Sequence, residues 1–219
     1  MGIIIIRLYL ITLNMCFGCS LISFKLHFPF HLRLFSILIG LAVATEFAVP
    51  IWLHNFHHST NYPVYDIYML LEYGLYAFYF KMIIQKRWMR QVIFCFIAVL
   101  PIVWVITTFF IAGFTAKWNV YMVLFGDSFA VAMCIGYFYE AFISDRLIDF
   151  KTSPEFWIAV GILFYSCCEI PVSGMLNYLE ANYQPTAMVV LSALQILNIL
   201  MYSIFIYAYL CPLKTNTKN

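Results

Sequence analysis

Apolar runs of about 20 residues recur along this chain, and short polar connections separate them. A helix needs about 20 apolar residues to cross the hydrocarbon core of a bilayer, so each run is long enough to span it. The pattern predicts an all-α fold in which residues 1–219 form a single bundle of seven transmembrane helices. The predicted spans are Ile3–Phe24, Leu34–Leu53, Ile67–Gln85, Gln91–Gly113, Val120–Ile143, Phe156–Leu179 and Met188–Leu210.

The composition agrees with a lipid environment. Of the 219 residues, 64% are hydrophobic and only 10% are charged, whereas about 25% of the residues in a soluble domain are charged. The chain therefore cannot cover itself with polar surface, and its main partner is expected to be the lipid bilayer. The net charge of +2 comes from dispersed basic residues, so it does not indicate nucleic-acid binding.

Lysines and arginines are distributed unevenly between the two sides of the predicted bundle. Only Arg7 and Lys117 fall on the side of the amino terminus. Because basic residues collect on the cytoplasmic side, we expect the amino terminus outside and the carboxyl terminus inside. The basic residues on the predicted inner side are Lys25, Arg33, Lys81, Lys86, Arg87, Arg90, Arg146, Lys151, Lys214 and Lys218.

Four carboxylates occupy nearly the same predicted depth in four different spans. With a rise of about 1.5 Å per residue, Glu46, Glu72 and Asp127 lie about 8–10 Å below the outer surface, and Glu169 lies about 12–15 Å below it. An ionisable group in the hydrocarbon costs about 2.5–3.5 kcal/mol even on the lenient insertion scale, so it indicates function by default. The alternative is that these groups only hold helices together through hydrogen bonds.

Polar neighbours of these acids recur at helical spacing. Tyr68 and Tyr76 flank Glu72 at intervals of four, on a stripe that also holds Tyr65 and Tyr79. In the last span, Gln195 and Asn198 share a face at a similar depth. These positions predict a polar, ligand-binding cavity in the outer half of the bundle. With Arg7 as the one plausible counter-charge, either some acids are protonated or a cation occupies the site.

A second candidate site lies in the connection after the second predicted span. His54, His57 and His58 have the spacing of metal ligands on a helix, and Asp66 follows soon after. Imidazoles and a carboxylate can hold zinc or copper, so these histidines are a candidate metal site. The alternative is a polar interfacial loop whose histidines happen to cluster.

Three common catalytic or phosphate-binding motifs are absent from the sequence. We find no glycine-rich phosphate loop, no H-E-x-x-H and no G-x-S-x-G, and no predicted span holds a histidine. The sequence also names no cofactor. An intramembrane lipid-modifying enzyme is therefore the third choice among the functions considered.

Several short motifs resemble those of small seven-span proteins of Bacteroidota bacteria, a group with no known activity. They are Glu72-Tyr73 in the third span, Pro154-Glu155-Phe156-Trp157-Ile158 at the start of the sixth, and Asn198-Ile199-Leu200-Met201-Tyr202-Ser203 in the seventh. The resemblance implies a multi-pass protein of the bacterial inner (cytoplasmic) membrane. In architecture the chain also resembles the seven-span input modules that precede bacterial histidine kinases.

These observations predict a ligand- or ion-sensing module. A small cation or a proton would bind among the four acids and their neutral partners, and helix movement would pass the signal to a separate cytoplasmic protein. The alternative is a small transporter or channel that uses the same acids to carry cations or protons.

Overall fold

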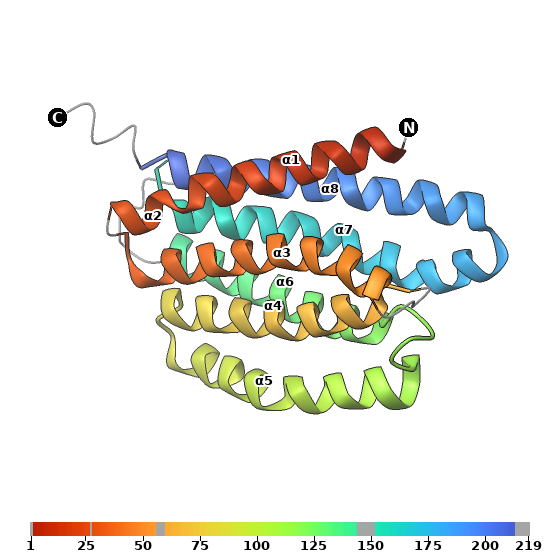
Figure 1. Cartoon of the computed structure of the whole chain (residues 1–219). Helices are drawn as coiled ribbons and strands as arrows, with labels where there is room; N and C mark the ends of the chain where they lie inside the picture. Colours follow the sequence, from red (N-terminus) through yellow and green to blue (C-terminus); the bar gives the residue numbers. More distant parts are fainter. Residues whose placement is uncertain (1, 27, 56–59, 144–151, 213–219) are drawn as a thin grey trace.

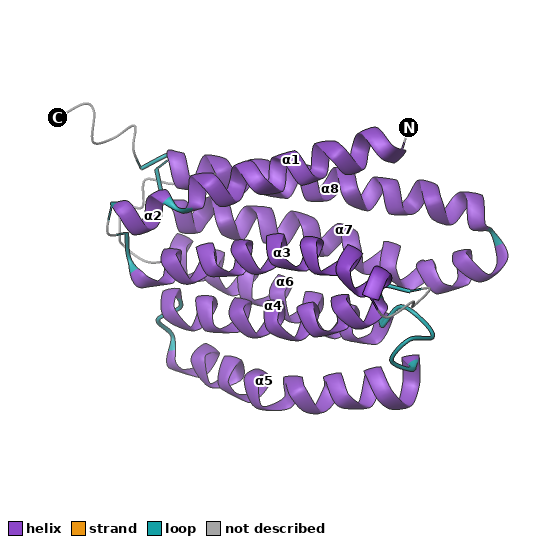
Figure 2. Cartoon of the chain, viewed as in Figure 1, coloured by secondary structure: helices purple, strands orange, loops and turns teal. Residues whose placement is uncertain are grey.

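The computed structural model describes residues 2–26, 28–55, 60–143 and 152–212. Within these residues the chain is helical apart from short connecting loops, and it contains no strand (Figure 2). The elements are α1 (Gly2–Ser20), α2 (Ile22–Lys25), α3 (Phe30–Asn55), α4 (Tyr62–Ile83), α5 (Arg87–Val105), η1 (Ile106–Ala112), α6 (Val120–Ile143), α7 (Pro154–Asn182) and α8 (Gln184–Leu210). The prediction of an all-α fold is confirmed.

The long helices run side by side, with α5 at one edge of the bundle and α1 beside α8 at the other (Figure 1). Among the described residues, six segments are long and apolar enough to cross a membrane, namely Ile4–Lys25, Phe30–Asn55, Arg87–Ala112, Val120–Ile143, Pro154–Asn182 and Gln184–Leu210. The bundle is therefore that of an integral membrane protein that crosses the bilayer several times.

Helix α4 is the long helix that lacks such an apolar window. It carries six tyrosines together with Asp66, Glu72 and Lys81. The bundle explains this composition, because α4 packs against α3, α5 and α6 and buries much of its surface there. A helix enclosed by its neighbours needs fewer apolar residues than one that faces lipid all round.

Prolines explain why two helices begin earlier than predicted. Helix α4 begins at Tyr62, with Pro63 in its first turn, and α8 begins at Gln184, with Pro185 in its first turn. Proline suits this place because its fixed φ favours the helix and its missing N–H has no partner there to lose. The extra turns lengthen both helices at the same end of the bundle.

The described basic residues lie mainly at one end of the bundle. Lys25 ends α2, Arg33 lies in the first turn of α3, and Lys81 lies in the last turn of α4. Lys86 and Arg87 lie at the start of α5 beside them. We call this the basic end, and the opposite end, at the right of Figure 1, the cavity end.

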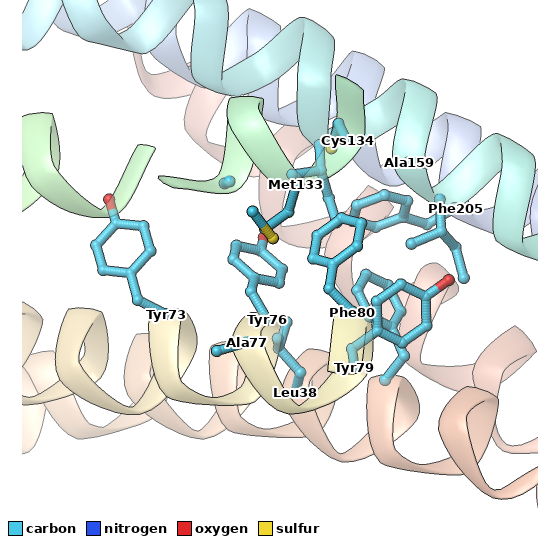
Figure 3. Close-up of a cluster of buried hydrophobic side chains, with 14 of the residues drawn as sticks. Leu38, Tyr73, Tyr76, Ala77, Tyr79, Phe80, Met133, Cys134, Ala159 and Phe205 are labelled. Carbon is cyan, nitrogen blue, oxygen red and sulfur yellow. The ribbon is translucent and has the colours of Figure 1, made fainter. Parts of the chain in front are cut away.

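Aromatic rings fill the half of the bundle nearer the basic end. Phe35, Tyr79, Phe80 and Phe205 are fully buried. The Phe35 ring lies 5.0 Å from that of Phe205 and 5.1 Å from that of Tyr79, centre to centre. Figure 3 shows tyrosines and Phe80 of α4 projecting toward the neighbouring helices within this cluster. We call Phe35, Tyr79, Phe80 and Phe205 the aromatic layer.

A stretch of π-helix, η1, continues α5 toward the cavity end. Near its start, the Thr107 hydroxyl donates to the carbonyls of Val103 and Trp104 in the preceding turn, at 2.8 and 3.3 Å, as threonine hydroxyls commonly do in helices. The element ends at Ala112, and the next residue, Gly113, has a φ of 75° that favours glycine.

Candidate functional site

A cavity of about 430 Å³ opens between α1, α3, α4, α7 and α8 at the cavity end. Its size falls in the range of small-molecule sites. Side chains that carry oxygen or nitrogen dominate its wall. They are Tyr9, Thr45, Glu46, Asn61, Tyr62, Tyr65, Tyr68, Glu72, Tyr73, Trp118, Tyr165, Glu169, Glu180, Gln195, Asn198 and Tyr202.

Most of the predicted ligand-binding residues lie around this cavity. Glu46, Tyr68, Glu72, Glu169, Gln195 and Asn198 line it. Tyr76 and Asp127 do not line it, but each contacts a residue that does. The structure thus brings together acids from α3, α4, α6 and α7 that are far apart in the sequence.

Glu72 lies between two tyrosines of its own helix. The hydroxyls of Tyr68 and Tyr76, one turn before and after it, donate hydrogen bonds of 3.0 and 3.1 Å to the same oxygen, Oε1. Side chains at i±4 share one helix face, which explains the geometry. Glu72 keeps partial exposure although it lies deep in the bundle, because part of its surface faces the cavity.

Glu46 repeats this arrangement with tyrosines from two other helices. Tyr9 of α1 donates a 2.9 Å hydrogen bond to Glu46 Oε1, and Tyr65 of α4 donates one of 3.2 Å to the same atom. The bonds join α1, α3 and α4 at the cavity wall. In both glutamates, the bonds found within the described chain engage Oε1, and Oε2 stays available for a further donor.

Asp127 lies behind the cavity wall and is 2% exposed. Its Oδ1 accepts hydrogen bonds from Ser166 at 3.0 Å and from Tyr73 at 3.3 Å. Its Oδ2 has no hydrogen-bond partner within the described residues. The carboxyl group interacts with that of Glu169 on α7, and both lie within electrostatic range of Glu72. Asp127 thus lies behind the wall and interacts with two acids, Glu72 and Glu169, that line the cavity.

Neutral amides of α8 also line the cavity. Asn198 Nδ2 donates to the Tyr165 hydroxyl at 3.3 Å and to the Leu194 carbonyl at 3.2 Å. Gln195 lines the cavity one turn away. The wall of the cavity therefore combines acids with neutral polar groups.

Sequence reasoning missed Glu180 and several of the aromatic residues at the site. Glu180 was placed beyond the sixth predicted span, but α7 extends to Asn182 and carries it to the mouth of the cavity. There its Oε2 accepts a 3.2 Å hydrogen bond from Tyr62. Trp118 packs edge-on against Tyr62 and Tyr65, with ring centres 6.2 and 6.0 Å away. In the sequence, the one sign that Tyr65 belongs to the site is its helical spacing from Tyr68, Glu72 and Tyr76 on the same stripe of α4.

The predicted counter-charge for the acids is absent from the cavity wall. Arg7 is exposed on α1 and does not line the cavity. Among the described lining residues, four are glutamates and none is lysine, arginine or histidine. The wall thus carries an excess of potential negative charge.

The predicted metal site falls largely outside the described residues, since His57 and His58 are not among them. His54 is exposed at the end of α3, and its Nδ1 lies 3.2 Å from Asn55 Oδ1. In the described part of the chain, no three His, Cys, Asp or Glu side chains form a group that holds a metal ion. The metal site therefore stays a prediction.

A second buried acid lies beside the cavity end. Asp66 is 1% exposed, and neither carboxylate oxygen has a hydrogen-bond partner within the described chain. The nearby amide of Asn119 donates instead to Thr107 and Thr108 of η1, at 3.2 and 2.9 Å. The sequence placed Asp66 near the histidine loop and gave no sign of its burial.

Comparison of the chain with protein-family models, curated proteins and solved structures finds no match.

Proposed function

We propose that this membrane protein is a sensory module that binds a small cation or cationic ligand in the cavity. The observation that carries the proposal is the wall itself, in which four glutamates have no basic side chain among the described lining residues. Carboxylates in a low-dielectric environment attract a cation strongly, because unpaired charge there is costly.

The packing beneath the cavity favours binding over passage. The aromatic layer closes the bundle toward the basic end, and its members are fully buried. Asn14, a polar residue of α1 closer to the basic end than the lining residues Ile6 and Tyr9, is exposed and donates to the Leu10 carbonyl at 2.7 Å. A bound ligand would then act by shifting the packed helices, and a separate cytoplasmic protein would read the movement.

The distribution of basic residues supports a cavity that opens to the outside of a bacterial inner membrane. Fusion reporters test this orientation. Alkaline phosphatase joined after Lys117 should be active, and joined after Lys86 it should be inactive, because only the first position is then extracytoplasmic. Green fluorescent protein at the same positions should give the opposite pattern. Reversed activities would contradict the orientation.

A thermal-shift screen of detergent-purified protein tests the binding function. The screen covers monovalent and divalent cations, amines and lipids at several pH values. We expect stabilisation by a cation that is lost in Glu72→Gln, because glutamine keeps a hydrogen-bond acceptor for Tyr68 and Tyr76 but removes the charge. A flat profile in wild type and variant alike would refute cation binding.

A transporter is the second candidate, and polar groups on the far side of the aromatic layer favour it. Ser36 hydrogen-bonds Ser23 and the Tyr209 hydroxyl, both at 2.9 Å, near the basic end. The buried hydroxyl of Tyr79 has no partner among the described residues. Flux of the stabilising cation into proteoliposomes would select the transporter, and binding without flux would select the sensor.

A further inference from the structure

The cavity is much larger than a bare metal ion requires. Its volume is about 430 Å³, and a dehydrated calcium ion needs six to eight oxygen ligands at about 2.3–2.6 Å around one point. The acids on the described wall do not converge in this way, since no three of them group closely enough to hold a metal. The space between them therefore suits a cation that has a molecular body.

Aromatic rings make up a large share of the wall. Seven tyrosines and Trp118 line the cavity. The face of an aromatic ring attracts a cation, and quaternary ammonium groups are commonly held in cages of such rings because their methyl groups leave them weakly hydrated. Small metal ions gain much less here, since rings do not replace the oxygen ligands of their hydration shells.

The tyrosine hydroxyls donate hydrogen bonds to the glutamates of the wall, and these bonds leave one oxygen of each carboxylate available for a cation. Tyr68 and Tyr76 engage one oxygen of Glu72, and Tyr9 and Tyr65 engage one oxygen of Glu46. The bonds fix both carboxylates and hold the rings beside them. An ammonium group can then contact a carboxylate oxygen and a ring face together.

Apolar side chains complete the cavity between the charged groups. Met69, Leu176, Leu194 and Met201 line it together with the amides of α8. A ligand with methyl or methylene groups would bury them against these side chains, while a bare ion has nothing to bury.

We propose that the ligand is an organic ammonium compound with an aliphatic body, held by the tyrosine rings and by Glu46 and Glu72. This inference rests on the proposed cation-binding function and specifies the class of cation.

Two pairs of probes separate charge from shape. Choline is compared with 3,3-dimethyl-1-butanol, its neutral carbon analogue, and putrescine is compared with 1,4-butanediol. Melting of the full-length protein in detergent is followed with each probe, and with sodium, potassium, magnesium and calcium chlorides. We expect at least one ammonium probe to raise the melting temperature and its neutral partner to leave it unchanged.

Variants of the wall locate the effect. Glu72→Gln and Glu46→Gln should each weaken the apparent affinity for the ammonium probe at least about ten-fold. Tyr165→Phe, which keeps the ring, should bind more tightly than Tyr165→Leu, which loses it. Glu140→Gln is the matched control, because Glu140 lies at the basic end and accepts hydrogen bonds from the Gln85 and Lys86 N–H groups. It should respond like wild type.

The outcomes distinguish this inference from the proposed function. Stabilisation by an inorganic cation alone, lost in Glu72→Gln, would overturn the ammonium inference and leave cation binding intact. Equal stabilisation by a charged probe and its neutral partner would also overturn it. No stabilisation by any probe or salt would refute both proposals. Gel filtration of each variant tests whether it is folded. If Glu72→Gln does not fold, Glu46→Gln takes its place as the test of cation binding.

Discussion

Tyr9 and Glu46 are joined by a 2.9 Å hydrogen bond that connects α1 to α3 at the wall of the cavity. The two residues are 37 positions apart, and Glu46 also accepts a bond from Tyr65 of α4. One carboxylate oxygen thus links three helices. Whatever binds to Glu46 therefore acts on the contacts among α1, α3 and α4.

We expect Tyr9→Phe to lower the free energy of unfolding by about 1 kcal/mol, since hydrogen bonds between membrane helices contribute about 0.6 kcal/mol on average and at most about 1.7. The ring contact with Tyr202, 6.2 Å between centres, stays in place. Unfolding in mixed detergent micelles measures the change. Tyr121→Phe on the exposed face of α6 is the control and should have no effect. An equal loss in both variants would contradict a specific role for the Tyr9 hydroxyl.

Gly126→Ala should destabilise the protein by about 1–3 kcal/mol, the usual cost of overpacking. A Cβ at Gly126 would overlap the ring of Tyr73, which is 3% exposed and donates to Asp127. Gly174→Ala on α7 is the matched control, because a Cβ there meets nothing within 4 Å. Thermal unfolding compares the two. If Gly126→Ala melts like Gly174→Ala, the close approach of α4 and α6 is not present in solution.

At the basic end, His31 Nε2 and Glu155 Oε1 lie 2.7 Å apart and link the start of α3 to the start of α7. We expect a double-mutant cycle of His31→Ala and Glu155→Ala to give a coupling free energy of about 0.5–1 kcal/mol, because both side chains keep some exposure. Glu155→Ala alone should cost more than His31→Ala alone, since Glu155 also accepts a 3.0 Å bond from Ser153. Additive single effects would rule out the contact.

Asp66→Asn should raise the free energy of unfolding by roughly 1–2 kcal/mol. The Asp66 carboxylate is 1% exposed and has no hydrogen-bond partner within the described residues, and a buried group that ionises without a partner is costly. Thermal unfolding at several pH values measures the effect. A fall in melting temperature would mean that the carboxylate itself holds α4 against η1 and α6.

The sequence by itself determined the class of the protein and most of its helices. Apolar runs as long as a bilayer is thick leave few alternatives, because backbone polar groups in lipid must pair within a helix. The i±4 stripe of Tyr68, Glu72 and Tyr76 was readable for the same reason, since helical spacing alone brings these three side chains together.

Only the tertiary structure decided how the acids relate to one another. Depth along a helix follows from the rise per residue, but the direction in which a side chain points around the bundle follows from packing. Glu72 and Glu169 face the cavity, whereas Asp127 at a similar depth lies behind the wall. Arg7, which was expected to neutralise the acids, is exposed and does not line the cavity.

The partners of Glu46 and Glu180 depended on tertiary structure in the same way. Tyr9 donates to Glu46 on another helix, 37 residues away in the sequence. Tyr62 donates to Glu180 on another helix, 118 residues away. No local pattern encodes such pairs, because the contact exists only after α1 packs beside α3 and α4 approaches α7. The chemistry of the cavity was therefore present in the sequence as residue types, and the packing of the helices made it a site.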